Sequence, residues 1–138
     1  MSSTSNRGVQ VGLWVLQGLV GLAMIASGAN KLLSSLDDLV KMGMSWAPEY
    51  GAGFVRFLGV CLVLGGLGLI LPAATRILPW LTPLAAAMLT LYFVLATGFH
   101  LQRGEPPIAP LILAALCAVV AVGRYKLAPI AARSPMKT

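Results

Sequence analysis

The sequence predicts an all-α membrane protein: a four-helix up-and-down bundle with a short interfacial helix between spans one and two. Hydrophobic residues make up 58% of the 138 residues and charged residues 10%, whereas soluble domains carry roughly 25% charged residues. This composition excludes a soluble globular enzyme, and it excludes a disordered chain, which needs low hydrophobicity. We expect residues 1–138 to form a single integral membrane domain with frayed termini at 1–7 and 127–138.

The expected spans cover residues 9–29, 52–71, 77–99 and 107–124. A membrane helix needs about 20 apolar residues to cross a hydrocarbon core of about 30 Å. Spans two and four contain shorter uncharged stretches than the other two. We expect them to gain a turn through snorkelling of Arg56, Arg124 and Lys126, whose charged ends would reach the headgroup region.

The connections favour antiparallel neighbours. Only residues 72–76 separate spans two and three, which predicts a helical hairpin. Pro79 and Pro83 fall in the first turns of span three, where proline is least costly. A turn around Gly104 and Pro106 separates spans three and four.

The connection between spans one and two, residues 30–50, is the long one. It carries apolar residues at helical spacing opposite polar ones. The apolar residues are Leu32, Leu33, Leu36, Leu39 and Val40, and the polar residues are Ser35, Asp38 and Lys41. This pattern predicts a short helix in the membrane interface.

The basic residues predict the orientation. Six lie on the side of the two termini: Arg7, Arg76, Arg124, Lys126, Arg133 and Lys137. The opposite side carries four, Lys31, Lys41, Arg56 and Arg103, together with all four acids, Asp37, Asp38, Glu49 and Glu105. Because cytoplasmic loops are enriched in Lys and Arg, we expect both termini in the cytoplasm and the chain in the cell (inner) membrane.

Polar residues within the spans are costly and therefore informative. If the polar faces point inward, the non-cytoplasmic mouth of the bundle gathers candidate ligand-binding residues, namely Asn30, Lys31, Arg56, His100 and Arg103. We expect a crevice below this mouth, lined by Gly59, Gly66 and Thr97. Cationic and imidazole donors above an apolar crevice suit a quinone head group, and His100 could exchange protons with it. Gln17 in span one is expected to bond across helices.

A purely structural role for these cations is equally consistent with the pattern, since they can snorkel to the interface and pair with the loop acids. No catalytic residue is predicted. No metal site is expected either, because the chain has one histidine and no Cys-x-x-Cys pair. Cys61 and Cys117 fall inside spans, where a free thiol behaves as a small apolar group. We expect no covalently bound cofactor and no nucleic-acid partner.

Several short motifs, in order, carry a family resemblance. They are GLAMIASGANK at 21–31, VRFLG at 55–59, GGLGLILP at 65–72, PWLTPLAA at 79–86 and FHLQRGE at 99–105. With these motifs the chain resembles the DoxX-like family of small four-span membrane proteins. The resemblance implies a four-helix membrane bundle and kinship with the small membrane subunits of thiosulfate:quinone oxidoreductase. Such sequences often carry a glutamate in span two, where this chain has Leu62.

Two functions remain open at this point. The first is a quinone-interacting or redox-linked subunit that works with a partner oxidoreductase and is not catalytic alone. The second is a non-catalytic membrane assembly or small-solute transport protein, in which glycine and alanine faces pack helices or protomers of a homo-oligomer. Both place the chain in a lipid bilayer.

Overall fold

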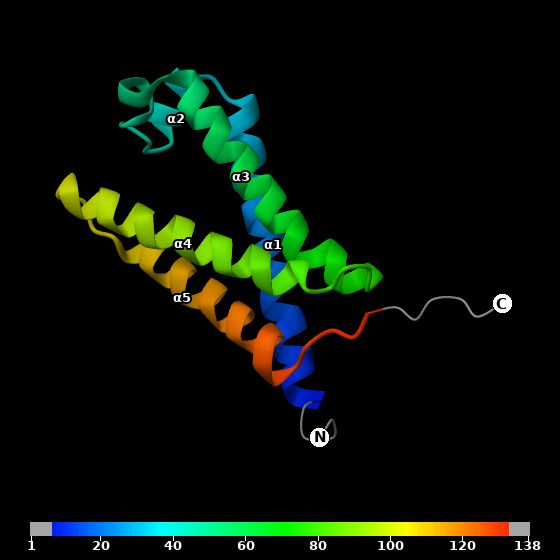
Figure 1. The fold of residues 1–138 in the computed structure, drawn as a ribbon. Helices are drawn as coiled ribbons and strands as arrows, with labels where there is room; N and C mark the ends of the chain where they lie inside the picture. The colour runs from blue at the N-terminus through cyan, green and yellow to red at the C-terminus, as the bar shows by residue number, and fades with distance from the viewer. Residues whose placement is uncertain (1–6, 133–138) are drawn as a thin grey trace.

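A computed structural model describes residues 7–132 and confirms an all-α bundle of four long apolar helices with a short helix between the first two. Figure 1 shows the elements. They are α1 (Arg7–Leu33), α2 (Leu36–Lys41), α3 (Ala47–Thr75), α4 (Leu81–Gln102), α5 (Ile108–Val122) and a π-helical turn, η2 (Gly123–Leu127). Helix α5 and η2 together make a 20-residue span, which covers about 30 Å at the helical rise.

The bundle consists of two crossed pairs. Helices α1 and α3 pack along much of their length, and α4 and α5 form a second pair that crosses them (Figure 1). Helices α3 and α4 come together at their connection and diverge toward the α2 end. Of the segments expected to be frayed, residues 1–6 and 133–138 lie outside the described residues, while Arg7 belongs to α1 and Leu127 to η2.

Small side chains allow α1 and α3 to approach closely. A Cβ atom at Gly28 would lie 2.5 Å from the carbonyl oxygen of Gly59, and one at Gly66 would lie 2.6 Å from that of Gly21. Such distances leave no space for any side chain. Close backbone contact at small residues is a common basis of helix association in membranes, where the hydrophobic effect does not drive helices together.

The core lies where the four long helices meet. Its buried residues are Val20, Met24, Leu62, Leu69, Ala86, Leu89, Phe93, Ala114, Cys117 and Val120. Leu62 is 2% exposed within it. An apolar side chain at this position therefore fits the surroundings, where an unpaired glutamate would be costly.

Helix α2 packs onto the first turns of α3. Leu39 is buried against Ala47 and Val55. Ser35 caps α2, and its hydroxyl accepts a hydrogen bond from the Asp38 amide at 3.1 Å. Leu32 and Leu33, expected on this connecting helix, belong to the end of α1 instead.

Residues 72–76 were expected to connect spans two and three, but α3 continues through Pro72 to Thr75. Proline cannot donate to the carbonyl four residues earlier, which here belongs to Gly68. The hydroxyl of Thr82 on α4 donates to that carbonyl oxygen at 3.1 Å. Helix α3 ends at Thr75 and is capped by Arg76, whose φ of 59° is left-handed, and α4 begins only at Leu81.

Candidate functional site

The expected mouth residues form two separate groups, the first between α1 and α3. Lys31 is 7% exposed, and its Nζ donates to the hydroxyl of Ser27 at 3.1 Å. The guanidinium of Arg56 donates from Nη1 to the carbonyl oxygens of Lys31, at 2.6 Å, and Ser34, at 2.7 Å. Asn30 bonds Ser34 and Met42 through its side chain. Arg56 therefore ties the end of α1 to α3.

The second group lies at the end of α4. His100 Nδ1 and Glu105 Oε1 are 2.7 Å apart. Arg103 donates from Nε to Glu105 at 3.3 Å and from Nη1 to Glu49 at 3.2 Å. The hydrogen bond with His100, helped by Arg103, lowers the pKa of Glu105. Glu49 stands in the first turn of α3, so this group links the ends of α3 and α4.

Aromatic residues accompany the second group. The ring centroids of Trp46 and Tyr50 each lie 5.6 Å from that of Phe99, within the range of favourable edge-to-face contacts. The Arg103 guanidinium stacks over Phe99, 5.6 Å from its centroid. These contacts join the two helix ends where α3 and α4 have otherwise diverged.

Within residues 7–132, no hydrogen bond or ion pair joins the first group to the second. Arg103 pairs with the acids Glu49 and Glu105, as the structural alternative expected, whereas Lys31 and Arg56 bond to neutral oxygens. The donors that these bonds use are not free for a ligand. The mouth residues thus hold helix ends together.

The residues expected to line a crevice below the mouth face other parts of the fold. Gly59 and Gly66 face α1 at the close approach described above. Thr97 is half-buried, and its hydroxyl donates to the Phe93 carbonyl of its own helix at 2.8 Å. In this structure α1 fills the space beside both glycines.

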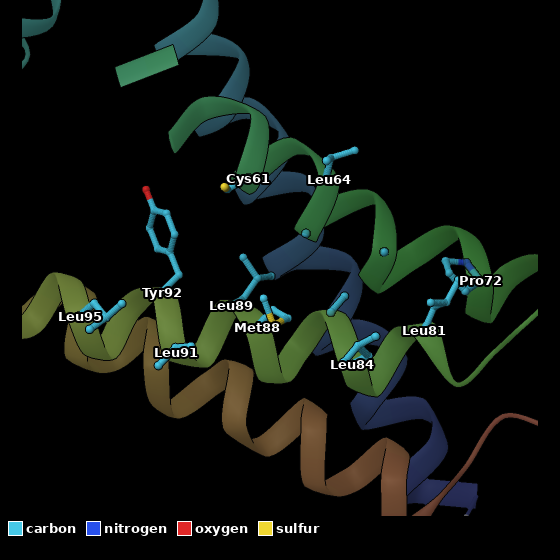
Figure 2. A pocket seen from close by; sticks show the side chains of 13 residues that line it. Cys61, Leu64, Pro72, Leu81, Leu84, Met88, Leu89, Leu91, Tyr92 and Leu95 are labelled. Atoms are coloured by element: carbon cyan, nitrogen blue, oxygen red, sulfur yellow. The ribbon is translucent and has the colours of Figure 1, made fainter. Parts of the chain in front are cut away.

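A cleft instead opens on the neighbouring face of α3, toward α4 (Figure 2). Its volume is about 540 Å³. Gly65 and Gly68 of α3 form part of one wall and Ala85 of α4 part of the other. The remaining lining residues are large and apolar, apart from Cys61 and Tyr92: Leu64, Pro72, Leu81, Leu84, Met88, Leu89, Leu91 and Leu95.

Tyr92 supplies a hydroxyl group to this cleft. Its ring rises from α4 toward α3, on the same side as Cys61 (Figure 2). Among the described residues, the Tyr92 hydroxyl has no hydrogen-bond partner. Sequence reasoning missed this site, although a tyrosine near the middle of an apolar span and glycines at 65 and 68, out of step with 59 and 66, were available as signals.

A buried polar cluster at the opposite end of the bundle was also missed. Arg124 was expected to snorkel to the headgroups, and this was wrong: the side chain turns inward and is 2% exposed. Its Nε donates to Gln17 and its Nη1 to Gln10, each at 2.6 Å. Gln17 in turn donates to the Leu69 carbonyl at 2.6 Å, which confirms its expected bond across helices. The π-helical turn η2 carries Arg124.

A comparison with protein families identifies the family of the chain. The model of the DoxX-like family matches residues 15–123. The chain belongs to the DoxX-like family. This DoxX-like protein is a multi-pass membrane protein by its four apolar spans. No curated protein and no solved structure matches the chain.

The family match ends one residue before Arg124. It includes the α3–α4 cleft of the DoxX-like protein and both groups at the mouth. Within residues 7–132, no group of three or more His, Cys, Asp or Glu side chains could hold a metal ion.

Proposed function

We propose that this DoxX-like protein binds a lipid-soluble carbonyl compound of the quinone class in the cleft between α3 and α4. The observation that carries the proposal is the cleft itself, with its apolar walls and the hydroxyl of Tyr92, which has no hydrogen-bond partner within residues 7–132. Binding pockets for small molecules typically combine such walls with a few polar groups that set the orientation. A quinone has a flat ring, carbonyl oxygens that accept hydrogen bonds, and an apolar chain.

The exposed edges of the cleft support entry from the bilayer. Leu64, Leu84, Met88 and Leu95 all line it and are exposed in the monomer. In a membrane these side chains face hydrocarbon, so an apolar ligand can enter sideways without crossing water. At the mouth, by contrast, Arg56 Nη1, His100 Nδ1 and Arg103 Nη1 already bond within the fold. The apolar walls of the cleft, which the charged mouth groups do not provide, support it as the site for an apolar ligand.

Thermal unfolding in nonionic detergent tests the binding. Decylubiquinone should raise the melting temperature of the wild-type protein, and Tyr92→Phe should weaken its affinity by about three- to tenfold, the value of one neutral hydrogen bond. Met88→Trp should abolish the stabilisation because the indole occupies the cleft. Ile112→Trp is the matched control, since Ile112 is an exposed apolar residue of α5 that does not line the cleft.

A further variant separates the two possible sites. His100→Ala should leave the stabilisation by decylubiquinone unchanged if the ligand lies in the cleft, and should remove it if the ligand lies at the mouth. Absence of any shift in the wild-type protein, or an unchanged shift in Met88→Trp, contradicts the proposal.

The proposal includes a partner oxidoreductase as the electron source. Reduction of a quinone to a quinol consumes two electrons and two protons. Oxidation of two thiols to a disulfide releases the same number of each, whereas oxidation of two thiosulfate ions to tetrathionate releases two electrons and the protons come from water. The kinship with subunits of a sulfur-oxidising enzyme, implied by the family resemblance, supports a thiol or thiosulfate donor. A complex isolated from native membranes through a tag on this chain should reduce decylubiquinone when given such a donor. Ligand binding without reductase activity would leave only the first part of the proposal standing.

A further inference from the structure

Arg124 is a charged residue that is buried in the bundle, with 2% of its surface exposed. Its guanidinium has five N–H donors, and the three hydrogen bonds that it makes do not use all five. Nε bonds Gln17, while Nη1 bonds Gln10 and, at 2.8 Å, the carbonyl oxygen of Ala128. The Nη2 atom is buried, with less than 1 Å² exposed, and has no hydrogen-bond partner among the residues that the structure describes. Buried polar atoms without a partner are rare in native structures.

Within residues 7–132, no acid neutralises the charge of Arg124. Its bonded acceptors are two side-chain amides and one carbonyl, all uncharged. The Trp14 ring lies 5.4 Å from the guanidinium carbon and provides a cation–π contact. All four acids of the sequence lie at the opposite end of the bundle or on α2. A buried charge is normally paired, and no residue in the described part of the chain supplies the anion for Arg124.

The surroundings indicate where an anion could come from. Arg7, Arg76 and Lys126 lie at the same end of the bundle, all exposed. Aromatic Trp14 and Tyr125 lie near the same level, as is typical of residues at the headgroup region. A cationic end without acids attracts anionic phospholipid headgroups.

A non-helical segment, residues 128–132, lies beside Arg124 and is held by arginines. Arg124 donates to the Ala128 carbonyl at 2.8 Å, and Arg76 donates from Nε to the Ala131 carbonyl at 2.9 Å. Figure 1 shows this segment leaving the base of the bundle past α1. Bonds from a guanidinium to neutral carbonyls are weaker than bonds to an anion. An anion can therefore take the place of this segment without breaking a helix.

We propose that Arg124 binds the phosphate group of an anionic phospholipid, which replaces the carbonyl of Ala128 and occupies the donors of Nη2. A planar guanidinium matches two phosphate oxygens at once. The amides of Gln10 and Gln17 keep the guanidinium oriented, and Trp14 covers its face. This site lies at the other end of the bundle from the mouth and is independent of the proposed quinone cleft.

Native mass spectrometry of the full chain in nonionic detergent tests the site, with phosphatidylglycerol as the probe. The wild-type protein should retain phosphatidylglycerol, and Arg124→Gln should bind it about tenfold more weakly, as expected for the loss of a charge-assisted bond. Lys126→Gln removes an exposed charge from the same turn and should change the affinity by less than about twofold. Phosphatidylcholine and inorganic phosphate are the comparison ligands, and both should bind more weakly than phosphatidylglycerol.

Two further measurements keep the test valid if Arg124→Gln fails to fold. Arg124→Lys keeps the charge but lacks the planar fork, so it should fold and still lose affinity. In the wild-type protein, phosphatidylglycerol should raise hydrogen exchange in residues 128–132. The proposal is overturned if the lipid has no effect, which is the result expected when a buried water alone satisfies Nη2. It is also overturned if Lys126→Gln loses as much affinity as Arg124→Gln, or if inorganic phosphate binds as well as the lipid.

Discussion

Individual polar side chains in this bundle act mainly by joining helices. Gln17 accepts from Arg124 and donates to the Leu69 carbonyl, so that one amide contacts two other segments of the chain. Arg56 performs a similar role at the other end, where it bonds two carbonyls near the end of α1. The sequence shows that these polar residues are present, but it does not show their hydrogen-bond partners. Those partners lie 22 to 107 positions away along the chain.

Acidification tests the contact between His100 and Glu105. Because the folded state lowers the pKa of Glu105, first through the His100 bond, the carboxylate contributes stability that is fully present above its ordinary pKa of 4.5. That stability is lost as the pH falls through the lower folded-state pKa. The melting temperature of Glu105→Gln, recorded across this acidic range in detergent, should therefore fall less steeply than that of the wild-type protein. Parallel profiles would contradict a stabilising role for this bond.

At the scale of elements, glycine and proline positions determine how the helices meet. Gly28 and Gly59, and likewise Gly21 and Gly66, bring α1 and α3 into backbone contact. Pro72 leaves the Gly68 carbonyl without its helical donor, and Thr82 of the next helix supplies one. In each case a glycine or proline of one helix matters because of a residue on the neighbouring helix. The sequence pattern of a single span does not reveal that neighbour.

A methyl group at the α1–α3 contact should be costly. Gly66→Ala places a Cβ against the Gly21 backbone, which cannot move aside like a side chain, and should lower the free energy of unfolding by about 1–3 kcal/mol. Gly98→Ala on α4 is the matched control, because nothing lies within 4 Å of its Cβ position. The control should be neutral or stabilising by up to about 1 kcal/mol through helix propensity. Equilibrium unfolding in mixed micelles measures both, and equal effects would refute the close contact.

The pairing of Thr82 with the Gly68 carbonyl can be measured by a double-mutant cycle. Thr82→Val alone should destabilise the protein by about 1 kcal/mol, because it leaves the carbonyl freed by Pro72 unpaired. In a Pro72→Ala background the backbone amide of residue 72 can donate to that carbonyl, and the same Thr82→Val change should cost much less. Additive effects of the two substitutions would show that Thr82 does not compensate for the proline.

At the scale of the whole molecule, the two ends of the bundle differ in chemistry. The bond from Arg124 to Gln10 places the start of α1 beside the end of α5, as an even number of spans requires. Among the described residues this end is basic and contains no acid, whereas the opposite end combines the acids with Lys41, Arg56 and Arg103. The lateral cleft opens between these ends, on the side where α3 and α4 diverge.

The charge asymmetry predicts both termini in the cytoplasm. With a membrane-impermeant maleimide, Lys41→Cys should be labelled in intact cells, and Lys126→Cys should be labelled only after permeabilisation. Both positions are exposed in the monomer, while the native thiols Cys61 and Cys117 lie within spans and serve as the background. The reverse labelling pattern would show the opposite orientation.

Sequence alone was sufficient for the class of the protein, the four spans and the short helix around Leu39, because hydropathy and spacing act over a few turns of one segment. It also identified the polar residues of the spans. Only the tertiary structure decided which side of α3 meets α1 and which opens as a cleft, since both faces carry glycines. It likewise turned Arg124 inward rather than toward the headgroups. The physical reason is that burial of these residues depends on contacts between helices, and no single span determines which neighbour covers which face.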